Sequence, residues 1–216
     1  MTADTQIAPA PHGNSKVTRQ DWLRAARDTL VSEGAGSVKI LRLSKELGVA
    51  RSSFYGYFND RTEVLDALLA EWENRNTRCI IDKCAEPTET INHAVCNFFE
   101  CFLDPMLFDH GLDFAVREWS RRDPAVRAKI DAADAQRLSA IKDVYVRHGF
   151  AEAEADARAR ILYFMQLGYH ALEIREQLDL RLSRVESYLK GFTGQDPTAD
   201  LVARFRARAM GISGDQ

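Results

Sequence analysis

Apolar residues recur at three- and four-residue intervals along nearly the whole chain, which is the spacing of one face of an α-helix. An early example is the stripe formed by Trp22, Leu23, Ala26, Leu30 and Val31. No run of alternating apolar and polar residues lasts long enough to predict a half-buried strand. The sequence therefore predicts an all-α fold.

The composition is that of a soluble globular protein. The 216 residues are 45% hydrophobic and 28% charged, which is enough apolar material for a substantial core. Residues 1–15 are the exception, because they are rich in small and turn-forming residues, and we expect a disordered N-terminal arm there. No stretch reaches the roughly 18 apolar residues of a membrane span, and the N-terminus lacks a secretory signal pattern, so we expect a cytoplasmic protein.

Glycines and capping residues divide the rest of the chain. Thr18 can cap a first helix, and short helices are expected at about 39–47 and 51–57, followed by a long one at 61–81 and others that include 152–177 and 198–210. We predict a helix-turn-helix domain at 16–61 and a larger helical bundle at 62–216. From Lys16 to Glu63 there are nine basic and six acidic residues, although the net charge of the chain is −3. This imbalance suits an N-terminal unit that contacts a polyanion.

The segment LSKELGVARSSFYGYFNDR at 43–61 has the pattern of a helix-turn-helix motif. Such a motif needs a small residue where the two helices nearly touch, here Ser44, and a turn glycine followed by an apolar residue, here Gly48 and Val49. Phe54 and Phe58 lie four residues apart and can anchor the second helix. A glycine between short helices is common in any helical bundle, but the whole combination favours DNA binding.

The same segment resembles the TetR family of transcriptional repressors, in which a glycine-valine turn precedes a short recognition helix that ends in a tyrosine-x-aromatic-phenylalanine pattern. Here that pattern is Tyr55, Gly56, Tyr57 and Phe58, and the resemblance extends from about 17 to 72. This chain has Lys39 where the family often has Ser or Thr; it also departs from the common pattern at Ala50, Tyr57 and Arg61.

The motif gives each exposed polar residue an expected role on DNA. We expect three residues to contact base edges, where arginine can hold guanine with two hydrogen bonds: Arg51, Ser52 and Tyr55. We expect four others to contact phosphates: Ser53, Tyr57, Lys39 and Arg61.

The resemblance also implies a homodimer whose interface is built by the last long helices. One recognition helix reads few bases, and a dimer places two of them about 34–36 Å apart in successive major grooves. The apolar stripes expected to form the interface are Ile161, Leu162, Met165, Tyr169 and Leu172, then Leu201, Val202 and Phe205. The alternative is that these stripes close a core within one protomer.

Aromatic residues are concentrated in the middle of the chain and can enclose an apolar pocket with a few polar anchors, although core packing is the alternative role for each residue. By resemblance, the pocket would bind a small organic ligand that releases the protein from DNA. The residues expected to line it are Phe98, Phe102, Phe114, Arg117, Glu118, Trp119, Tyr145, Tyr163, Gln166 and His170.

The predicted partners are therefore a double-stranded DNA operator, a second copy of the chain and a small ligand, with no membrane and no cofactor. A ligand-independent DNA-associated scaffold or protein-interaction factor on the same fold is the main alternative. An enzyme is a weaker one, since no catalytic or metal motif is recognisable. His93, Cys96 and Glu100 share a helical face and lie near Cys101, but a single helix supplies at most a partial metal or redox site.

Overall fold

The computed structural model describes residues 17–214, and all regular structure within that range is helical. This confirms the all-α prediction, whereas the arm predicted at 1–15 lies outside the described residues. The elements are α1 (Arg19–Glu33), the 3₁₀ turn η1 (Ala35–Ser37), α2 (Ile40–Glu46), the 3₁₀ helix η2 (Arg51–Gly56), α3 (Arg61–Trp72), the π-helical turn η3 (Glu73–Thr77), α4 (Arg78–Ala85), α5 (Ile91–Leu103), α6 (His110–Ser120), α7 (Pro124–Arg147), α8 (Glu152–Ala171), α9 (Leu178–Ser183), α10 (Val185–Thr193) and α11 (Ala199–Gly214).

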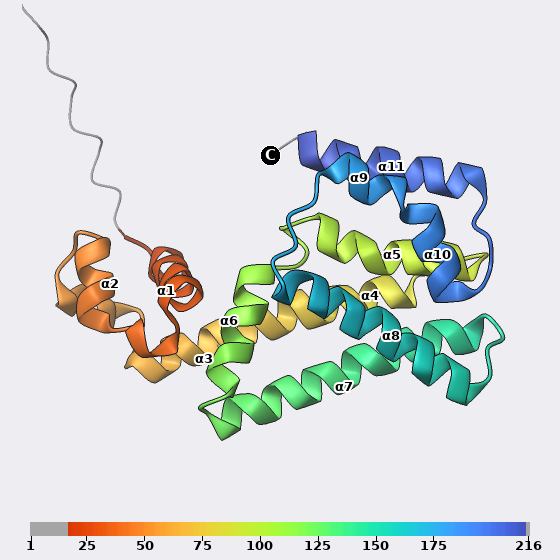
Figure 1. Cartoon of the computed structure of the whole chain (residues 1–216). Helices are drawn as coiled ribbons and strands as arrows, with labels where there is room; N and C mark the ends of the chain where they lie inside the picture. Colours follow the sequence, from red (N-terminus) through yellow and green to blue (C-terminus); the bar gives the residue numbers. More distant parts are fainter. Residues whose placement is uncertain (1–16, 215–216) are drawn as a thin grey trace, which may run out of the picture.

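A small unit made of α1, α2 and η2 occupies one end of the molecule, and α3 leads from it into a larger helical body (Figure 1). The first helix begins where its capping residue predicts. The Thr18 side chain accepts a hydrogen bond from the Asp21 backbone, and the Asp21 carboxylate accepts one from the Thr18 backbone in return. This reciprocal cap satisfies two backbone donors that the helix cannot pair internally.

The small unit shares its core with the body. Its buried residues, among them Trp22, belong to one cluster with Trp72 of α3, Leu112 of α6 and Val126 and Ile130 of α7. The small unit meets the body directly where α1 packs on α6. A domain boundary at residue 61 stays a prediction.

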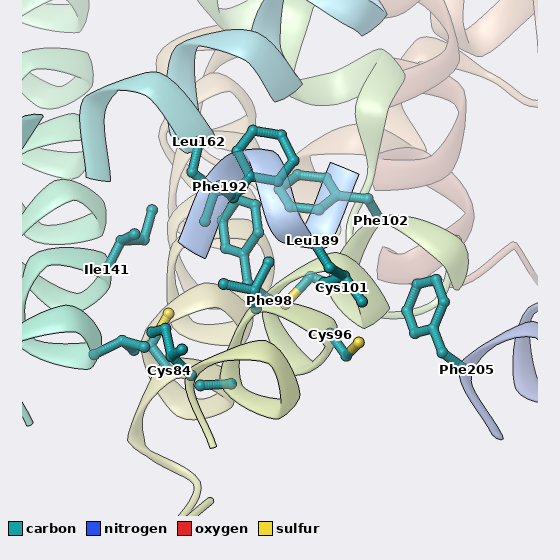
Figure 2. Close-up of a cluster of buried hydrophobic side chains, with 14 of the residues drawn as sticks. Cys84, Cys96, Phe98, Cys101, Phe102, Ile141, Leu162, Leu189, Phe192 and Phe205 are labelled. Atoms are coloured by element: carbon teal, nitrogen blue, oxygen red, sulfur yellow. The ribbon is translucent and has the colours of Figure 1, made fainter. Parts of the chain in front are cut away.

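A second buried cluster holds the larger body together. It draws on α4, α5, α7, α8, α10 and α11, and Figure 2 shows Phe98 and Phe102 of α5 among Ile141, Leu162 and Phe192 from three other helices. Among the described residues, no helix combines the length and apolar character needed to cross a membrane.

Three local expectations need correction. The helix expected at 61–81 continues to Ala85, but η3 widens it in the middle; such π turns are frequent at functional sites. The helix expected at 152–177 ends at Ala171, because the backbone reverses at Glu173, whose φ is +48°. Val31 is 41% exposed, since the buried face of α1 is formed by Leu30 and its neighbours at helical spacing.

Candidate functional site: an exposed recognition helix and an internal cavity

The turn between α2 and η2 has the geometry that the sequence predicts. Gly48 has a φ of +66°, a left-handed conformation that other residues rarely adopt. The Val49 backbone N–H then donates to the Ser44 carbonyl at 2.9 Å, and the Ser44 side chain is buried. A larger residue at Ser44 would therefore have to enter the close contact between the two helices.

The recognition segment is a 3₁₀ helix, Arg51–Gly56, and not the two α-helical turns expected at 51–57. Phe54 and Phe58 point inward and are almost fully buried, with the Phe54 ring 5.2 Å from that of Trp22 in an edge-on arrangement. This anchoring fixes which face of η2 points outward. The outward face carries Arg51, Ser52 and Tyr55, all exposed.

Two exposed groups on this face already contact each other. An Arg51 terminal nitrogen donates to the Tyr55 hydroxyl at 3.3 Å, one turn along the segment. The contact holds the guanidinium group close to the tyrosine side chain without burying it. Arginine keeps other donors available, so the pair can still present hydrogen bonds outward.

The four residues expected on phosphates fall into two groups. Lys39 is exposed at the start of α2, and its side chain has no hydrogen bond or ion pair with any other described residue. By contrast, the Tyr57 hydroxyl donates to the Val17 carbonyl at 2.7 Å, and the Ser53 hydroxyl donates to the Ala50 carbonyl at 2.8 Å. Arg61 donates to the Val38 carbonyl at 2.6 Å and also to that of Ala35.

These hydrogen bonds give Arg61 a structural role that the sequence pattern did not predict. Its guanidinium group joins the first turn of α3 to the loop before α2, and both acceptors are backbone oxygens that lie more than twenty residues away. The side chain is half-buried, and two of its donors are engaged within the protein. Arg61 therefore clamps the small unit, which means that it holds the loop before α2 against the start of α3.

A partly open cavity of about 90 Å³ lies between α5, the end of α8 and the α9–α10 segment. Figure 2 shows part of its surroundings, with Phe205 of α11 facing Cys96 on α5. Most of its lining is apolar. The lining residues are Cys96, Phe99, Phe102, Leu103, Met165, Gln166, Tyr169, Glu176, Leu178, Arg181, Leu182, Val185, Tyr188, Leu189 and Phe205.

Only Phe102 and Gln166 of the ten residues predicted for a pocket line this cavity. The other eight lie elsewhere, because the apolar stripes of α5–α8 mostly face each other. Phe98 and Tyr145 pack in the core, and Arg117 and Tyr163 take part in an ionic network. The remaining residues are Phe114, Glu118 and Trp119 on α6, and His170, which is hydrogen-bonded to Gln166. The α9–α10 segment was not predicted as a pocket wall, and its mixed composition gave little signal.

A buried ionic network fills the space between α3, α6, α7 and α8. The Asp113 carboxylate accepts hydrogen bonds from Trp72 at 2.7 Å, from Arg117 at 2.9 Å and from Arg137 at 3.1 Å. Burial opposes ionisation of Asp113, but Arg137 and Arg117 outweigh it and lower the pKa to about 2. Asp134 completes the network by accepting two hydrogen bonds from Arg117.

A second polar chain leads from the cavity to the small unit. His170 is hydrogen-bonded to Gln166 at 2.7 Å and stacks on His110, with ring centroids 3.7 Å apart. Next to His110, the Asp109 carboxylate accepts a hydrogen bond from Arg27 of α1 at 2.6 Å. Burial lowers the pKa of both histidines, so the stacked rings are uncharged at neutral pH.

The predicted interface residues also separate into two groups. Ile161 on α8 is 60% exposed, Leu172 directly after the end of α8 is 75% exposed, and Phe164 between them is exposed too. Their spacing of three and eight residues puts them along one face. The remaining six line the cavity or the core of one protomer: Leu162, Met165, Tyr169, Leu201, Val202 and Phe205.

The residues considered for a metal or redox site have other surroundings. Glu100 forms ion pairs with Lys83 and Arg208, and Cys101 is buried. Burial raises the pKa of the Cys96 thiol to about 12, which leaves it uncharged. Within residues 17–214, no group of three or more His, Cys, Asp or Glu side chains is placed to hold a metal ion.

The short α2, the left-handed turn and the exposed, anchored η2 define a helix-turn-helix protein with a helical second body. Comparison with known proteins agrees. Residues 23–68 match the family model described as bacterial regulatory proteins, tetR family. This N-terminal segment is therefore similar to the corresponding part of tetR-family bacterial regulatory proteins.

A curated relative matches only a part of the chain. TtgW of Pseudomonas putida, an uncharacterized HTH-type transcriptional regulator, is 36% identical over 56 residues, which is 26% of this chain and 42% of TtgW. The match therefore spans less than half of that relative.

Solved structures resemble the chain over nearly its whole length. The ketosteroid transcriptional regulator KstR2 of Mycobacterium tuberculosis has a TM-score of 0.60 at 18% identity, covering 88% of this chain and 98% of its own. AmtR of Mycobacterium smegmatis has a TM-score of 0.57 at 19% identity, covering 94% of this chain and 98% of its own. GusR of Salmonella enterica has a TM-score of 0.55 at 15% identity, covering 90% of this chain and 94% of its own. These likenesses show the fold.

Proposed function

We propose that this protein is a dimeric, sequence-specific DNA-binding repressor that a small organic ligand releases from its operator. The observation that carries the proposal is the outward face of η2. Arg51, Ser52 and Tyr55 are exposed there, while Phe54 and Phe58 anchor the segment in the core. An exposed polar face on a rigid support is what reading base edges in a major groove requires.

Exposure and hydrogen bonding of the side chains support the following set of DNA contacts. Arg51, Ser52 and Tyr55 read base edges, and Lys39 contacts a phosphate. Ser53 and Tyr57 approach the backbone through the same face, but their hydroxyl protons are directed at carbonyls, so they act as acceptors or through water. Arg61 supports the reading surface from behind and does not need to touch DNA.

The test starts by selecting duplexes from a random pool with the purified protein. We expect Arg51→Ala to weaken binding to the selected duplex by about 1–3 kcal/mol and to relax base preference at one position. Lys39→Ala should weaken all duplexes alike and make the salt dependence shallower.

Arg127→Ala is the matched control, since it removes an exposed arginine from α7. If Arg51→Ala keeps the wild-type affinity and base preference in gel-shift titrations, Arg51 does not read DNA.

The exposed face of α8 supports dimerisation. Ile161, Phe164 and Leu172 form an apolar stripe that nothing else in the described protomer covers. Burying such a stripe against its copy removes apolar surface from water, and a two-fold contact of this kind closes on itself. The partner protomer would then supply the second η2 that a specific site requires.

Ligand release requires that the cavity and the reading surface share a movable element. The polar chain from Gln166 through His170 and His110 reaches Asp109 and, through it, Arg27 on α1. A ligand that favours one position of α6 would move the small unit, because α1 is tied to the start of that helix. The turn η3 gives the connecting helix a place to bend.

A scaffold without a ligand is the second candidate, and the shared core of the two units is compatible with it. The distinction is whether any small molecule changes operator affinity. A bound ligand that leaves both the operator Kd and the distance between paired η2 segments unchanged would favour the scaffold.

A further inference from the structure

The cavity beside α9 has one strongly polar end. Its walls are otherwise formed mostly by aliphatic and aromatic side chains from α5, α8, α9, α10 and α11. Tyr169 contacts both Glu176 and Arg181, so these three groups form the polar end, and Gln166 also lines the cavity. A pocket of this kind orients a ligand through the few polar groups it contains.

Arg181 is the group at this end whose charge is not balanced. Its guanidinium carbon lies 4.7 Å from the centre of the Tyr169 ring, and the side chain is half-buried. In the part of the chain that the structure describes, no carboxylate lies within ion-pair distance of it. An arginine held over an aromatic ring keeps its outer donors available for an oxyanion.

Glu176 does not balance Arg181, because it is already paired. Its carboxylate forms an ion pair with Arg184 and accepts a 3.5 Å hydrogen bond from the Tyr169 hydroxyl. Counting these three ionised groups leaves one positive charge at the mouth of an apolar cavity. The nearby His170 adds none, since burial, His110 and Arg181 together lower its pKa to about 4.

The size of the cavity limits the ligand. An apolar cavity of about 150 Å³ can bind benzene, and the cavity here is about 90 Å³. A single ring or a short branched chain fits if the carboxyl end projects toward Arg181 and the walls give slightly. Larger polycyclic ligands would require the α9–α10 segment to move away.

We infer that the cavity binds a small monocarboxylic acid with an apolar body, whose carboxylate pairs with Arg181 while its ring or chain lies among Phe99, Phe102 and Leu189. This inference rests on the proposed ligand-responsive function only for its biological consequence. Binding itself depends on the cavity alone and can be measured without DNA.

The experiment titrates the full-length protein with benzoate and, separately, with the neutral isostere benzamide by calorimetry. Wild type should bind benzoate at least about tenfold more tightly than benzamide. Arg181→Gln should weaken benzoate binding about 10- to 100-fold, the usual effect of losing a charge-assisted hydrogen bond, and should leave benzamide binding nearly unchanged.

Two variants guard against indirect effects. Arg175→Gln removes an exposed arginine from the loop that precedes α9 without touching the cavity, and benzoate affinity should stay at the wild-type value. Arg181→Lys keeps the charge and should retain part of the preference. Circular dichroism confirms that each variant is folded.

A second readout comes from His170. Because Arg181 contributes to its low pKa, a bound carboxylate that neutralises Arg181 should raise that pKa, and NMR titration with saturating benzoate detects the rise. Equal affinity for benzoate and benzamide, no benzoate binding at millimolar concentration, or unchanged benzoate binding in Arg181→Gln each overturns the inference. If benzoate does not bind as expected but the protein still binds its operator specifically, the proposed DNA-binding function stands. If benzoate binds but no operator is recognised, only the proposed DNA-binding function is rejected.

Discussion

The buried carboxylate of Asp113 offers the sharpest test of how this fold is held together. Its side chain is fully buried and accepts hydrogen bonds from Trp72, Arg117 and Arg137. Arg137 is itself fully buried, with its guanidinium carbon 5.2 Å from the centre of the Trp72 ring. Asp113→Asn keeps the size of the side chain, removes its charge and replaces one acceptor oxygen with an NH2 donor.

The expected loss of stability is large because Arg137 would lose its ion-pair partner. Removing one partner of a buried pair costs about 3–5 kcal/mol. Asparagine can still accept the Trp72 hydrogen bond, and Asp134 still neutralises Arg117, so we expect the low end, about 3 kcal/mol. For a chain of this length that corresponds to a fall in Tm of about 6–12 °C.

Urea unfolding followed by circular dichroism, at one protein concentration for all variants, measures the effect as a lower midpoint with an unchanged slope. Asp131→Asn is the matched control. Asp131 pairs with Arg127 on the exposed face of α7, where such pairs contribute about 0.5 kcal/mol or less. If the two variants lose similar stability, or if Asp113→Asn loses less than about 1 kcal/mol, the reasoning about the buried network is refuted.

Three further outcomes are expected. Leu172→Glu should weaken dimerisation at least about tenfold in analytical ultracentrifugation. Met106→Glu changes a similarly exposed apolar residue away from α8 and should leave dimerisation unchanged. Equal effects of the two variants would contradict an interface on α8. The pKa of His170 is lowered from 6.5 to about 4, so the unfolded chain binds more protons than the folded one between these pH values. The free energy of unfolding should therefore fall as the pH drops from 6.5 to 4. A His170→Asn variant with the same pH dependence would show that His170 is not its source. Arg27→Ala removes the hydrogen bond between α1 and Asp109. The ratio of operator Kd values with and without saturating benzoate should then fall by about 2- to 30-fold, while operator DNA and benzoate each still bind alone. An unchanged ratio would exclude coupling through Arg27 and Asp109.

The reading unit could be predicted because its signals are local. The cap at Thr18, the turn at Gly48 and the pair Phe54 and Phe58 each act on neighbours within a few residues, so their spacing alone indicates the geometry. What the spacing could not supply was the 3₁₀ form of η2. In the structure this segment packs on α1 through the contact between Phe54 and Trp22.

The cavity was harder to predict because many apolar stripes on many helices compete for the same core. An aromatic residue such as Phe98 or Tyr145 has the same pattern whether it packs in the core or lines a pocket. Arg181 lies in a segment without strong periodicity, and its importance comes from having no carboxylate nearby among the described residues. Such an imbalance exists only once distant segments are brought together.

The sequence by itself determined the helices, the position of the turn and the residues that η2 presents outward, since all of these follow from interactions between near neighbours in the chain. Only the tertiary structure decided that Arg61 clamps the small unit, that Asp113 meets Arg137 and that α9 closes a cavity over α5. Those contacts join residues some twenty or more positions apart, and their partners are selected by the packing of whole helices.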